Sequence, residues 1–529
     1  MMNGTLLEFI NILSDDVSIV TNRLRTWEAF EDYRHLIVDK LITITGLCQC
    51  IPKPYHKYTK LVYDGAYFLL MGISKDRLID LIAHQLSIET NTTDVSTPER
   101  LIGLATKIPV LYKLGQIIAR NPDVEQSFRH WLIKLENGII TTNILYFKRF
   151  VESALKDNID KYAICIDNHI LSEASVAVVA SFKWQDAAKE SNGVFKIIKP
   201  DICAYLNEEL ALLDGLALYY SKNRETYGLL NFNFIDTLKD VSTLLKNEVS
   251  LIKEQNNLYE AAYFYKKDDG LKVPALFSFS NENVTAMEKI EGTKITEAQL
   301  TRQERIDCCK AITRAIICYT LFCETTMCLF HGDPHAGNIF VVQGDDKAVK
   351  VVFLDWALTG KLSRQERHAI LWTAIGVFLD NKNIAFNALL RLAKNNFVFK
   401  DFEHTFMQAF DNYDCNARRS LIEKTLNLVD TVVKSGITFP DNLLLFRKSV
   451  FTVKGVIHHL EPQFNMDEYF LEYMKELLIS ELPTRVKSSF MPFIDNYANY
   501  TSLLTNYDLF YLGNFIAFNN IYNFLHAEQ

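Results

Sequence analysis

Apolar residues in the first 150 positions recur at intervals of three and four. This period places them on one face of a helix, so the region is predicted to be helical. The pattern changes after Ser172, where β-branched and apolar residues dominate 175–182 and 194–198. These two runs predict a pair of strands, joined by a polar turn at 185–193.

Helical and strand-like patterns alternate through the rest of the chain. The predicted elements are helices over 205–257 and 301–329, a hairpin over 276–288, and further helices from Ser363 onward, with breaks near Pro440 and Pro483. A mixture of this kind, with strands grouped ahead of a long helical region, is typical of an α+β fold.

The segment 330–338 reads Phe-His-Gly-Asp-Pro-His-Ala-Gly-Asn, and an apolar run then leads to Asp355. Asp333 precedes Asn338 by five residues, which is the order in which a kinase-type site presents its catalytic Asp and a metal-binding Asn. Asp355 stands where such a site has its second metal-binding residue. Because Mg²⁺ prefers hard oxygen ligands, Asn338 and Asp355 are predicted to hold it.

Two other interpretations of this segment need to be weighed. Asp, Gly, Pro and Asn are common turn residues, so the segment taken alone also fits a hairpin turn. The strand and the Asp that follow favour the kinase-type interpretation, since structural context is what supports a motif. A zinc site at His331 and His335 is excluded, because Gly332 and Pro334 break the helix that their four-residue spacing would require.

Lys196 lies in the apolar strand 194–198, and a lysine in such a strand is rarely buried without a partner. In kinases a strand lysine holds the α- and β-phosphates of ATP and pairs with a helical Glu. Glu248 and Glu254 are both candidates for that partner, facing different directions on the predicted helix. No G-x-G-x-x-G precedes Lys196. Small residues take its place: Ser172, Ala174, Ser175 and Ala177.

Composition narrows the functional classes. The 529 residues are 49% hydrophobic and 23% charged, with a formal net charge of −8, and they allow two to four domains. The absence of a Lys/Arg run argues against nucleic acid as the main partner. The ten cysteines include no C-x-x-C pair and are expected to be reduced thiols in a cytoplasmic protein.

No signal peptide is recognisable, and no run of 18 uncharged apolar residues predicts a membrane-spanning helix. The aromatic-rich tail at 497–525 comes closest, but seven Asn and Asp residues interrupt it. It is predicted to form an amphipathic helical pair packed on the core. Peripheral contact with a membrane surface is the alternative.

Taken together, these motifs resemble the UbiB family of atypical kinase-like proteins over about 101–392. The resemblance includes a K-x-G-Q motif at 113–116, the small-residue loop, the strand lysine, and the Asp–Asn and Asp motifs. Members of that family look like ATP-binding proteins that support coenzyme Q biosynthesis and act at membranes on lipids or lipid-bound partners. The resemblance therefore implies ATP and Mg²⁺ as cofactors.

The resemblance also assigns roles by position. Lys113 and Gln116 become the motif that occludes the site, and 172–177 becomes the nucleotide loop. Lys196 and Glu254 become an ion pair, with Glu248 as a contact to the N-terminal extension. The remaining assignments are Asp333 as the catalytic residue, and Asn338 and Asp355 as metal ligands. Apart from the resemblance, Glu288 is a further nucleotide-binding candidate.

The chain departs from the family pattern at several positions. The departures are Ser250 for an Asp, Glu173 within the small-residue loop, Ala336 for a Pro, and Trp356-Ala357 for Phe-Gly. None removes a metal ligand or the phosphate lysine. There is also no room for an activation segment between Asp355 and the helix expected from Ser363, so the chain is not expected to dock extended peptides.

The sequence therefore predicts a two-lobed, protein-kinase-like α+β fold. Its regions are a helical N-terminal extension at 1–150, an N-lobe with a helical insert at 151–292, a C-lobe at 293–400, and a helical C-terminal extension at 401–529. The expected activity is that of an atypical kinase or ATPase acting on a small-molecule or lipid acceptor. A choline- or aminoglycoside-type kinase and a nucleotide-gated lipid-binding scaffold are the alternatives.

Overall fold

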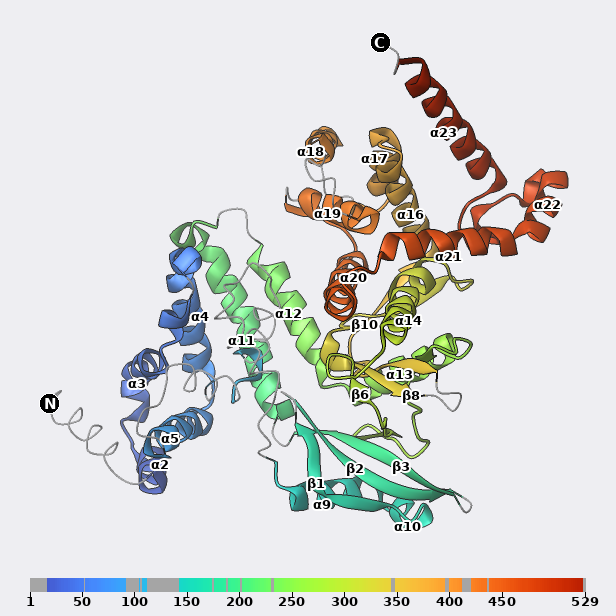
Figure 1. Cartoon of the computed structure of the whole chain (residues 1–529). Helices are drawn as coiled ribbons and strands as arrows, with labels where there is room; N and C mark the ends of the chain where they lie inside the picture. Colours follow the sequence, from blue (N-terminus) through green and yellow to red (C-terminus); the bar gives the residue numbers. More distant parts are fainter. Residues whose placement is uncertain are drawn as a thin grey trace. The chain divides into compact units, whose positions relative to one another are not determined.

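The structure, a computed structural model, describes residues 17–51, 53–91, 104, 107–111, 142–173, 176–186, 189–199, 202–229, 233–343, 348–394, 399–411, 420–434 and 437–526. The chain divides into two compact units. The first unit contains 1–253 and 277–288, and the second contains 254–276 and 289–529. Figure 1 shows their helices and strands coloured along the sequence.

Helices make up most of the first unit. They are α2 (Val17–Thr26), α3 (Phe30–Thr45), α4 (Thr59–Gly72), α5 (Lys75–Asn91), α9 (Ile144–Leu155), α10 (Asn158–Lys161), α11 (Ile202–Lys222) and α12 (Phe234–Glu248). The buried guanidinium of Arg77 on α5 bonds to Glu208 of α11 at 2.8 Å and also to Glu209. A buried charge placed among carboxylates in this way is compensated, so the pairs connect α5 to α11.

The first unit also contains an antiparallel sheet in the order β1-β2-β3-β5. Its strands are β1 (Cys165–Glu173), β2 (Ala177–Asp186), β3 (Lys189–Ile198) and β5 (Val284–Glu288). Apolar side chains of α9, among them Phe147 and Val151, pack on one face of the sheet (Figure 1). The rings of Phe182 and Phe195 stack in this core with centroids 3.8 Å apart.

The two predicted strands are thus β2 and β3, but both are longer than expected, and β1 was not predicted. The predicted polar turn at 185–193 is wrong, since β2 continues to Asp186 and β3 already begins at Lys189. Polar residues in this ribbon pair across the strands instead of forming a turn. Lys183 and Glu190, for example, form an exposed ion pair of 2.9 Å.

The single helix predicted over 205–257 is three helices, because the chain breaks twice. The first break comes after Lys222, where α11 ends and a short 3₁₀ turn, Arg224–Tyr227, follows. That turn ends at a left-handed Gly228 (φ 67°), a conformation that a residue without Cβ adopts easily. At the second break α12 ends at Glu248 and α13 (Leu251–Tyr265) begins three residues later. Glu248 and Glu254 therefore lie on different helices, and the premise that they share one helix was wrong.

Short strands of the second unit position its polar motifs. They are β4 (Leu271–Lys272), β6 (Thr293–Lys294), β7 (Met327–His331), β8 (Ile339–Gln343), β9 (Val349–Phe353) and β10 (Thr359–Ser363). β8 and β9 are antiparallel with Ile339 opposite Phe353, so Asn338 and Leu354 lie at the same end of this hairpin. β7 pairs with β10, which places His331 opposite Thr359.

The second unit is otherwise helical. Its helices are α14 (Arg302–Thr313), α15 (Tyr319–Leu321), α16 (Arg364–Phe378), α17 (Lys382–Leu390), α18 (Phe399–Asp411), α19 (Leu421–Lys434), α20 (Asp441–Leu460), α21 (Met466–Ser480), α22 (Leu482–Phe490) and α23 (Asn506–His526). The helix predicted over 301–329 ends earlier, at Leu321, after a π-helical turn at Arg314–Cys318. The predicted helix start at Ser363 is confirmed, because Ser363 and Glu366 form a capping box.

The prediction for the tail was wrong. A single long helix, α23, replaces the expected helical pair, and three of the aromatic side chains described on it do not pack on a core: Tyr507, Phe510 and Phe518 are about 70% exposed. In Figure 1 this helix extends away from its neighbours. Among the helices that the structure describes, none combines the length and apolar character needed to span a bilayer.

Candidate active site

His331, the last residue of β7, is fully buried and connects two of the predicted motifs. Its Nε2 lies 2.9 Å from the carbonyl oxygen of Leu354, and its Nδ1 accepts the main-chain N–H of Asp333 at 3.1 Å. Burial lowers the pKa of His331, so the imidazole is neutral with its proton on Nε2. It therefore ties the catalytic segment to the residue that precedes Asp355.

Gly332 allows this segment to approach the chain that follows Asp355. Its N–H donates to the carbonyl of Leu358 at 2.9 Å, and a Cβ on Gly332 would lie 2.8 Å from Leu358 Cγ. A side chain at this position would push the two segments apart. Gly332, directly before the predicted catalytic Asp333, is therefore needed for steric reasons.

The turn between Asp333 and Asn338 is held by its own polar groups. The carbonyl of Asp333 accepts the N–H of His335 at 2.8 Å and the side-chain Nδ2 of Asn338 at 3.2 Å. His335 in turn caps the short 3₁₀ turn Ala336–Asn338, accepting the N–H of Gly337 at 3.0 Å. Since Nδ2 of Asn338 is bonded to Asp333, its oxygen points the other way.

Asp355 follows β9 and is exposed, with a left-handed backbone (φ 57°). The residues on both sides hold it there. Leu354 donates its N–H to the carbonyl of Asn338 at 2.8 Å, while the buried Trp356 donates from its indole to Phe353 at 3.0 Å. A non-glycine residue kept at positive φ by its surroundings is a strain that clusters at functional sites.

Trp356, which stands at the family's Phe position, is held by two contacts. Its ring packs edge-on against His331, with centroids 4.7 Å apart, and its carbonyl accepts Nδ2 of the buried Asn257 on α13 at 2.9 Å. The sequence analysis did not single out Asn257. The sequence could have pointed to Asn257 only as an Asn in the middle of an apolar helical pattern.

The structure thus brings the predicted metal ligands Asn338 and Asp355 to the same end of the β8–β9 hairpin, beside Asp333. One carboxamide and one carboxylate oxygen fit Mg²⁺, which usually takes few protein ligands and keeps several waters. Among the described residues, no group of three or more His, Cys, Asp or Glu could hold a metal ion.

A residue missed by sequence reasoning contacts Asp333. Lys448 on α20 places its Nζ 3.2 Å from Oδ1 of Asp333, while Nε2 of His335 lies 3.9 Å from Oδ2. Lys448 is 115 residues from Asp333 and belongs to no motif, so no local pattern could have identified it.

Lys196 occupies the middle of β3, between the fully buried Phe195 and Ile197, and is itself half-buried. Its cross-strand neighbours are Val179 and Thr285. Glu254 is almost fully buried on α13, at 3% exposure. Because Lys196 belongs to the first unit and Glu254 to the second, their ion pair stays a prediction.

The nucleotide loop is described only in part. Ser172 is exposed at the end of β1 and Ala177 is buried at the start of β2, whereas Ala174 and Ser175 lie outside the described residues. Glu173, the departure inside this loop, points into the unit. Its carboxylate lies 2.9 Å from Nζ of Lys199 and also accepts the N–H of Thr142 at 2.9 Å. The Glu173 carboxylate is therefore used in contacts with Lys199 and Thr142 and is not available to bind a nucleotide.

Other candidates can be placed only along the chain. Glu288 is the half-buried last residue of β5, where the chain passes from the first unit to the second. Lys113 and Gln116, with the whole K-x-G-Q motif, lie outside the described residues. The side chain of Glu248 is likewise not described, although its place at the end of α12 is.

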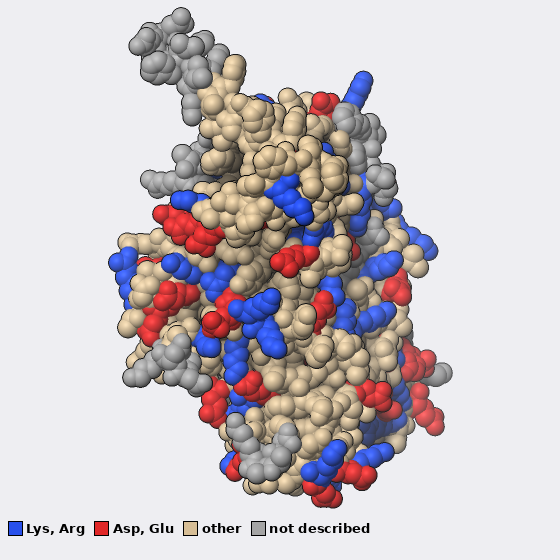
Figure 2. All heavy atoms as spheres, turned by 90° about the vertical axis from the view of Figure 1, so that its right-hand side faces the viewer, with Lys and Arg blue, Asp and Glu red and all other residues tan. Residues whose placement is uncertain are grey.

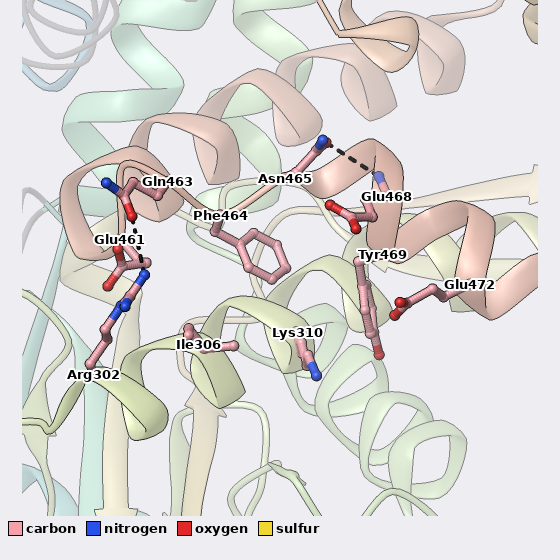
Figure 3. A pocket seen from close by; sticks show the side chains of 10 residues that line it. All are labelled: Arg302, Ile306, Lys310, Glu461, Gln463, Phe464, Asn465, Glu468, Tyr469 and Glu472. Atoms are coloured by element: carbon pink, nitrogen blue, oxygen red, sulfur yellow. Dashed lines mark hydrogen bonds between the residues drawn. The ribbon is translucent and has the colours of Figure 1, made fainter.

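A cavity of about 250 Å³ lies between α14 and α21 (Figure 3). Arg302 donates to Gln463 at 3.1 Å at one end of it, and Glu468, Glu472 and Tyr469 line the other. Phe464 lies between the two ends. Cations, carboxylates and aromatic rings are mixed here, and none comes from the predicted motifs. The Asp333 segment, and not this cavity, therefore stays the predicted site of phosphoryl transfer.

Comparison with known proteins identifies a kinase-like domain. Residues 134–388 match the ABC1 atypical kinase-like domain. A probable protein kinase UbiB from Glaesserella parasuis is 22% identical over 382 residues, covering 70% of this chain and 68% of the relative. The protein of the same name from Blochmanniella pennsylvanica is 24% identical over 413 residues, covering 75% and 74%.

Among solved structures, the complex of Rv3197 with erythromycin from Mycobacterium tuberculosis matches at 16% identity with a TM-score of 0.43, covering 73% of this chain and 95% of that one. The Rio2 kinase complex with ADP/Mg²⁺ and phosphoaspartate from Chaetomium thermophilum matches at 10% identity with a TM-score of 0.24, covering 66% and 96%. The predicted kinase-like α+β fold class is confirmed, with the domain match as its basis.

Proposed function

Residues 134–388 of this chain match an ABC1 atypical kinase-like domain, which marks an enzyme of the kinase type, and from that premise we propose that the chain binds Mg²⁺–ATP. The γ-phosphoryl group goes to a small or lipidic acceptor or to water, and the reaction serves a lipid-linked process such as quinone biosynthesis. The relatives named probable protein kinase UbiB support the kinase part of this proposal.

One observation carries the proposal. Asp333, Asn338 and the segment before Asp355 are joined by hydrogen bonds through Asn338 and His331. These bonds support a site in which Asp333 would be the catalytic carboxylate and Asn338 and Asp355 the two oxygen ligands. Catalysis of phosphoryl transfer consists mainly of positioning and charge stabilisation, so a preorganised turn of this kind suits the reaction.

Each residue then has a definite task. Asp333 orients the attacking hydroxyl or water and accepts its proton, while His331 stays neutral and keeps the turn in register. Asn338 and Asp355 would hold Mg²⁺, which neutralises charge on the phosphate oxygens when it is bound. Lys196 would bind the α- and β-phosphates as a point charge, with Glu254 as its partner.

The short connection after Asp355 supports a small acceptor. Only β10 separates Asp355 from the capped start of α16 at Ser363. Protein kinases use a longer, ordered segment at this point to dock peptides. An acceptor that carries its own hydroxyl into the site does not need one.

Exposed apolar side chains near the C-terminus support a lipidic acceptor and peripheral contact with a membrane. Leu482, Val486 and Phe490 follow one another at four-residue intervals on α22, and Phe493 is 84% exposed. Between Phe490 and His526 the sequence contains two charged residues and no Lys or Arg. Figure 2 shows few charged side chains over the upper part of the molecule, where α23 lies. Aromatic side chains are enriched at membrane–water interfaces.

The test uses the full chain. Mg²⁺–ATP binding is measured by calorimetry with and without EDTA, and ADP release is then followed with phosphatidylcholine vesicles present or absent. Metal-dependent binding with turnover that rises on vesicles supports the proposal. Binding without turnover under every lipid condition favours the nucleotide-gated scaffold, and no binding at all overturns the assignment. Untargeted lipid analysis of a strain lacking the protein would identify the process it serves.

A further inference from the structure

We propose that Lys448 is a positioning residue for Asp333, so that the C-terminal helix α20 completes the phosphoryl-transfer site. The inference rests on the proposed function and deepens it. Nζ of Lys448 lies 3.2 Å from Oδ1 of Asp333, within hydrogen-bonding distance of a charged pair. Lys448 lies outside the matched domain, which ends at residue 388, so the C-terminal region contributes directly to the site.

The helix that carries Lys448 is held in place beside Asp333, because α20 contacts the Asp333 segment at two further points. The ring of Phe446 packs edge-on against Phe330, with centroids 5.4 Å apart. A Cβ on Gly332 would lie 3.1 Å from Cδ2 of Leu445. Phe330, Gly332 and Asp333 are thus each opposed by a residue of one helical turn, from Leu445 to Lys448.

The chemistry of the pair explains why a cation is useful there. A carboxylate that orients a nucleophile must keep one rotamer while charge moves through the site, and an ammonium bonded to Oδ1 restricts that rotation. Lysine suits this task, since it is a compact charge that bonds to one oxygen at a time. The third residue near the carboxylate, His335, lies 3.9 Å from Oδ2, beyond hydrogen-bonding distance.

A plain surface ion pair is the competing explanation. The Lys448 side chain is 44% exposed, and exposed pairs contribute little to stability. The two explanations therefore differ in what the lysine changes. A surface pair would alter neither turnover nor its dependence on Asp333, whereas a positioning residue lowers turnover while leaving the fold and nucleotide affinity unaltered.

The chain offers a matched control on the same helix. Lys454 is 41% exposed and pairs with Glu423, away from Asp333. Lys448→Met should lower kcat for ADP release about 10- to 100-fold, the range expected when a catalytic group is displaced by an ångström, and leave the ATP affinity within about twofold. Lys448→Arg should restore most of the turnover. Lys454→Met should match wild type.

A double-mutant cycle shows whether the lysine acts through Asp333. In an Asp333→Asn background, Lys448→Met should reduce the remaining turnover by less than about twofold, because the group to be positioned is already lost. Equal losses in both backgrounds overturn the proposal, as does wild-type turnover in Lys448→Met. If wild type itself neither binds Mg²⁺–ATP nor releases ADP, the proposed function has failed instead.

A readout without nucleotide tests the contact itself. Reductive methylation of the lysine amines, quantified by mass spectrometry, reports how strongly each amine is held. Asp333→Asn should increase the methylation rate at Lys448 several-fold and leave the rate at Lys454 unchanged. An unchanged rate at Lys448 shows that the pair does not exist in solution, and the proposal falls whatever the turnover.

Discussion

The side-chain amide of Asn338 donates a hydrogen bond to the carbonyl oxygen of Asp333, 3.2 Å away, so a predicted metal ligand is fixed by the predicted catalytic residue itself. The carbonyl of Asn338 in turn accepts the N–H of Leu354 at 2.8 Å, next to Asp355. These hydrogen bonds join the predicted catalytic residue, one predicted metal ligand and the residue before the other. Substitutions at Asp333 and Asp355 should therefore separate metal binding from catalysis.

Asp355→Asn should weaken Mg²⁺–ATP binding by about tenfold or more, because a carboxylate ligand to the metal is lost in the ground state. Asp333→Asn should bind nucleotide almost as wild type does, yet lose turnover by about 10²- to 10⁴-fold, since its role belongs to the transition state. Calorimetry in Mg²⁺ and in EDTA, alongside ADP release, measures both effects.

Asp380→Asn is the matched control, because Asp380 is also an exposed aspartate with a left-handed backbone (φ 50°) in the second unit. Its nucleotide affinity should equal that of wild type. Undiminished binding in both Asp355→Asn and Asp333→Asn would remove the metal assignment.

The predicted ion pair of Lys196 and Glu254 can be tested by a double-mutant cycle on nucleotide affinity and on unfolding. Glu254 is only 3% exposed, and removing one partner of a buried pair typically costs about 3–5 kcal/mol. Lys196→Met and Glu254→Gln should each have a large effect, and the double variant should be little worse than either. Additive losses would show that the two residues act separately.

Glu173 should stabilise the first unit through its buried carboxylate, which is fully buried and lies 2.9 Å from Lys199. Glu173→Ala leaves Lys199 and the N–H of Thr142 without this partner, so the free energy of unfolding should fall by about 3–5 kcal/mol. Urea unfolding followed by circular dichroism measures the loss.

The same sheet supplies the control. Glu190 lies at the same distance, 2.9 Å, from Lys183, but both side chains are more than half exposed. Glu190→Ala should therefore change the free energy of unfolding by no more than about 1 kcal/mol. Equal effects of the two substitutions would contradict the view that burial gives the Glu173 pair its strength.

Much of the site could be predicted because its residues are close in sequence. Asn338 follows Asp333 by five positions, and one β-hairpin brings Asp355 beside them, so spacing and strand pattern were sufficient to predict the group. The start of α16 was predictable for the same reason, since the Ser363–Glu366 capping box is a local signal.

The features that sequence reasoning missed depend on long-range contacts. Lys448 is brought to Asp333 by packing of Phe446 and Leu445, 115 residues along the chain. The inward direction of Glu173 depends on Lys199 across the base of the loop. The break between Lys222 and Phe234 interrupts a helical pattern whose apolar period continues on both sides, so periodicity alone joined separate helices.

His331 should make the stability of the second unit depend on pH. Burial lowers its pKa from the ordinary 6.5, so the folded protein keeps the imidazole neutral while the unfolded chain takes up a proton as the pH falls below about 6.5. The unfolded state then binds more protons than the folded state. The free energy of unfolding must therefore decrease with falling pH, by up to about 1.4 kcal/mol per pH unit, until the folded imidazole itself protonates.

His331→Gln removes this titration, so urea unfolding of the variant between pH 7.5 and 5.5 should show a shallower loss of stability than wild type. The slope should not vanish, because burial also lowers the pKa of His84 and His368 in the same direction. A lower stability at pH 7.5 is expected as well, since the link from β7 to Leu354 is weakened. The slope, not the absolute stability, tests the assignment. If wild type and variant lose stability equally over this range, His331 is not held neutral in the folded protein, and its place as the fixed link between Asp333 and Leu354 would have to be abandoned.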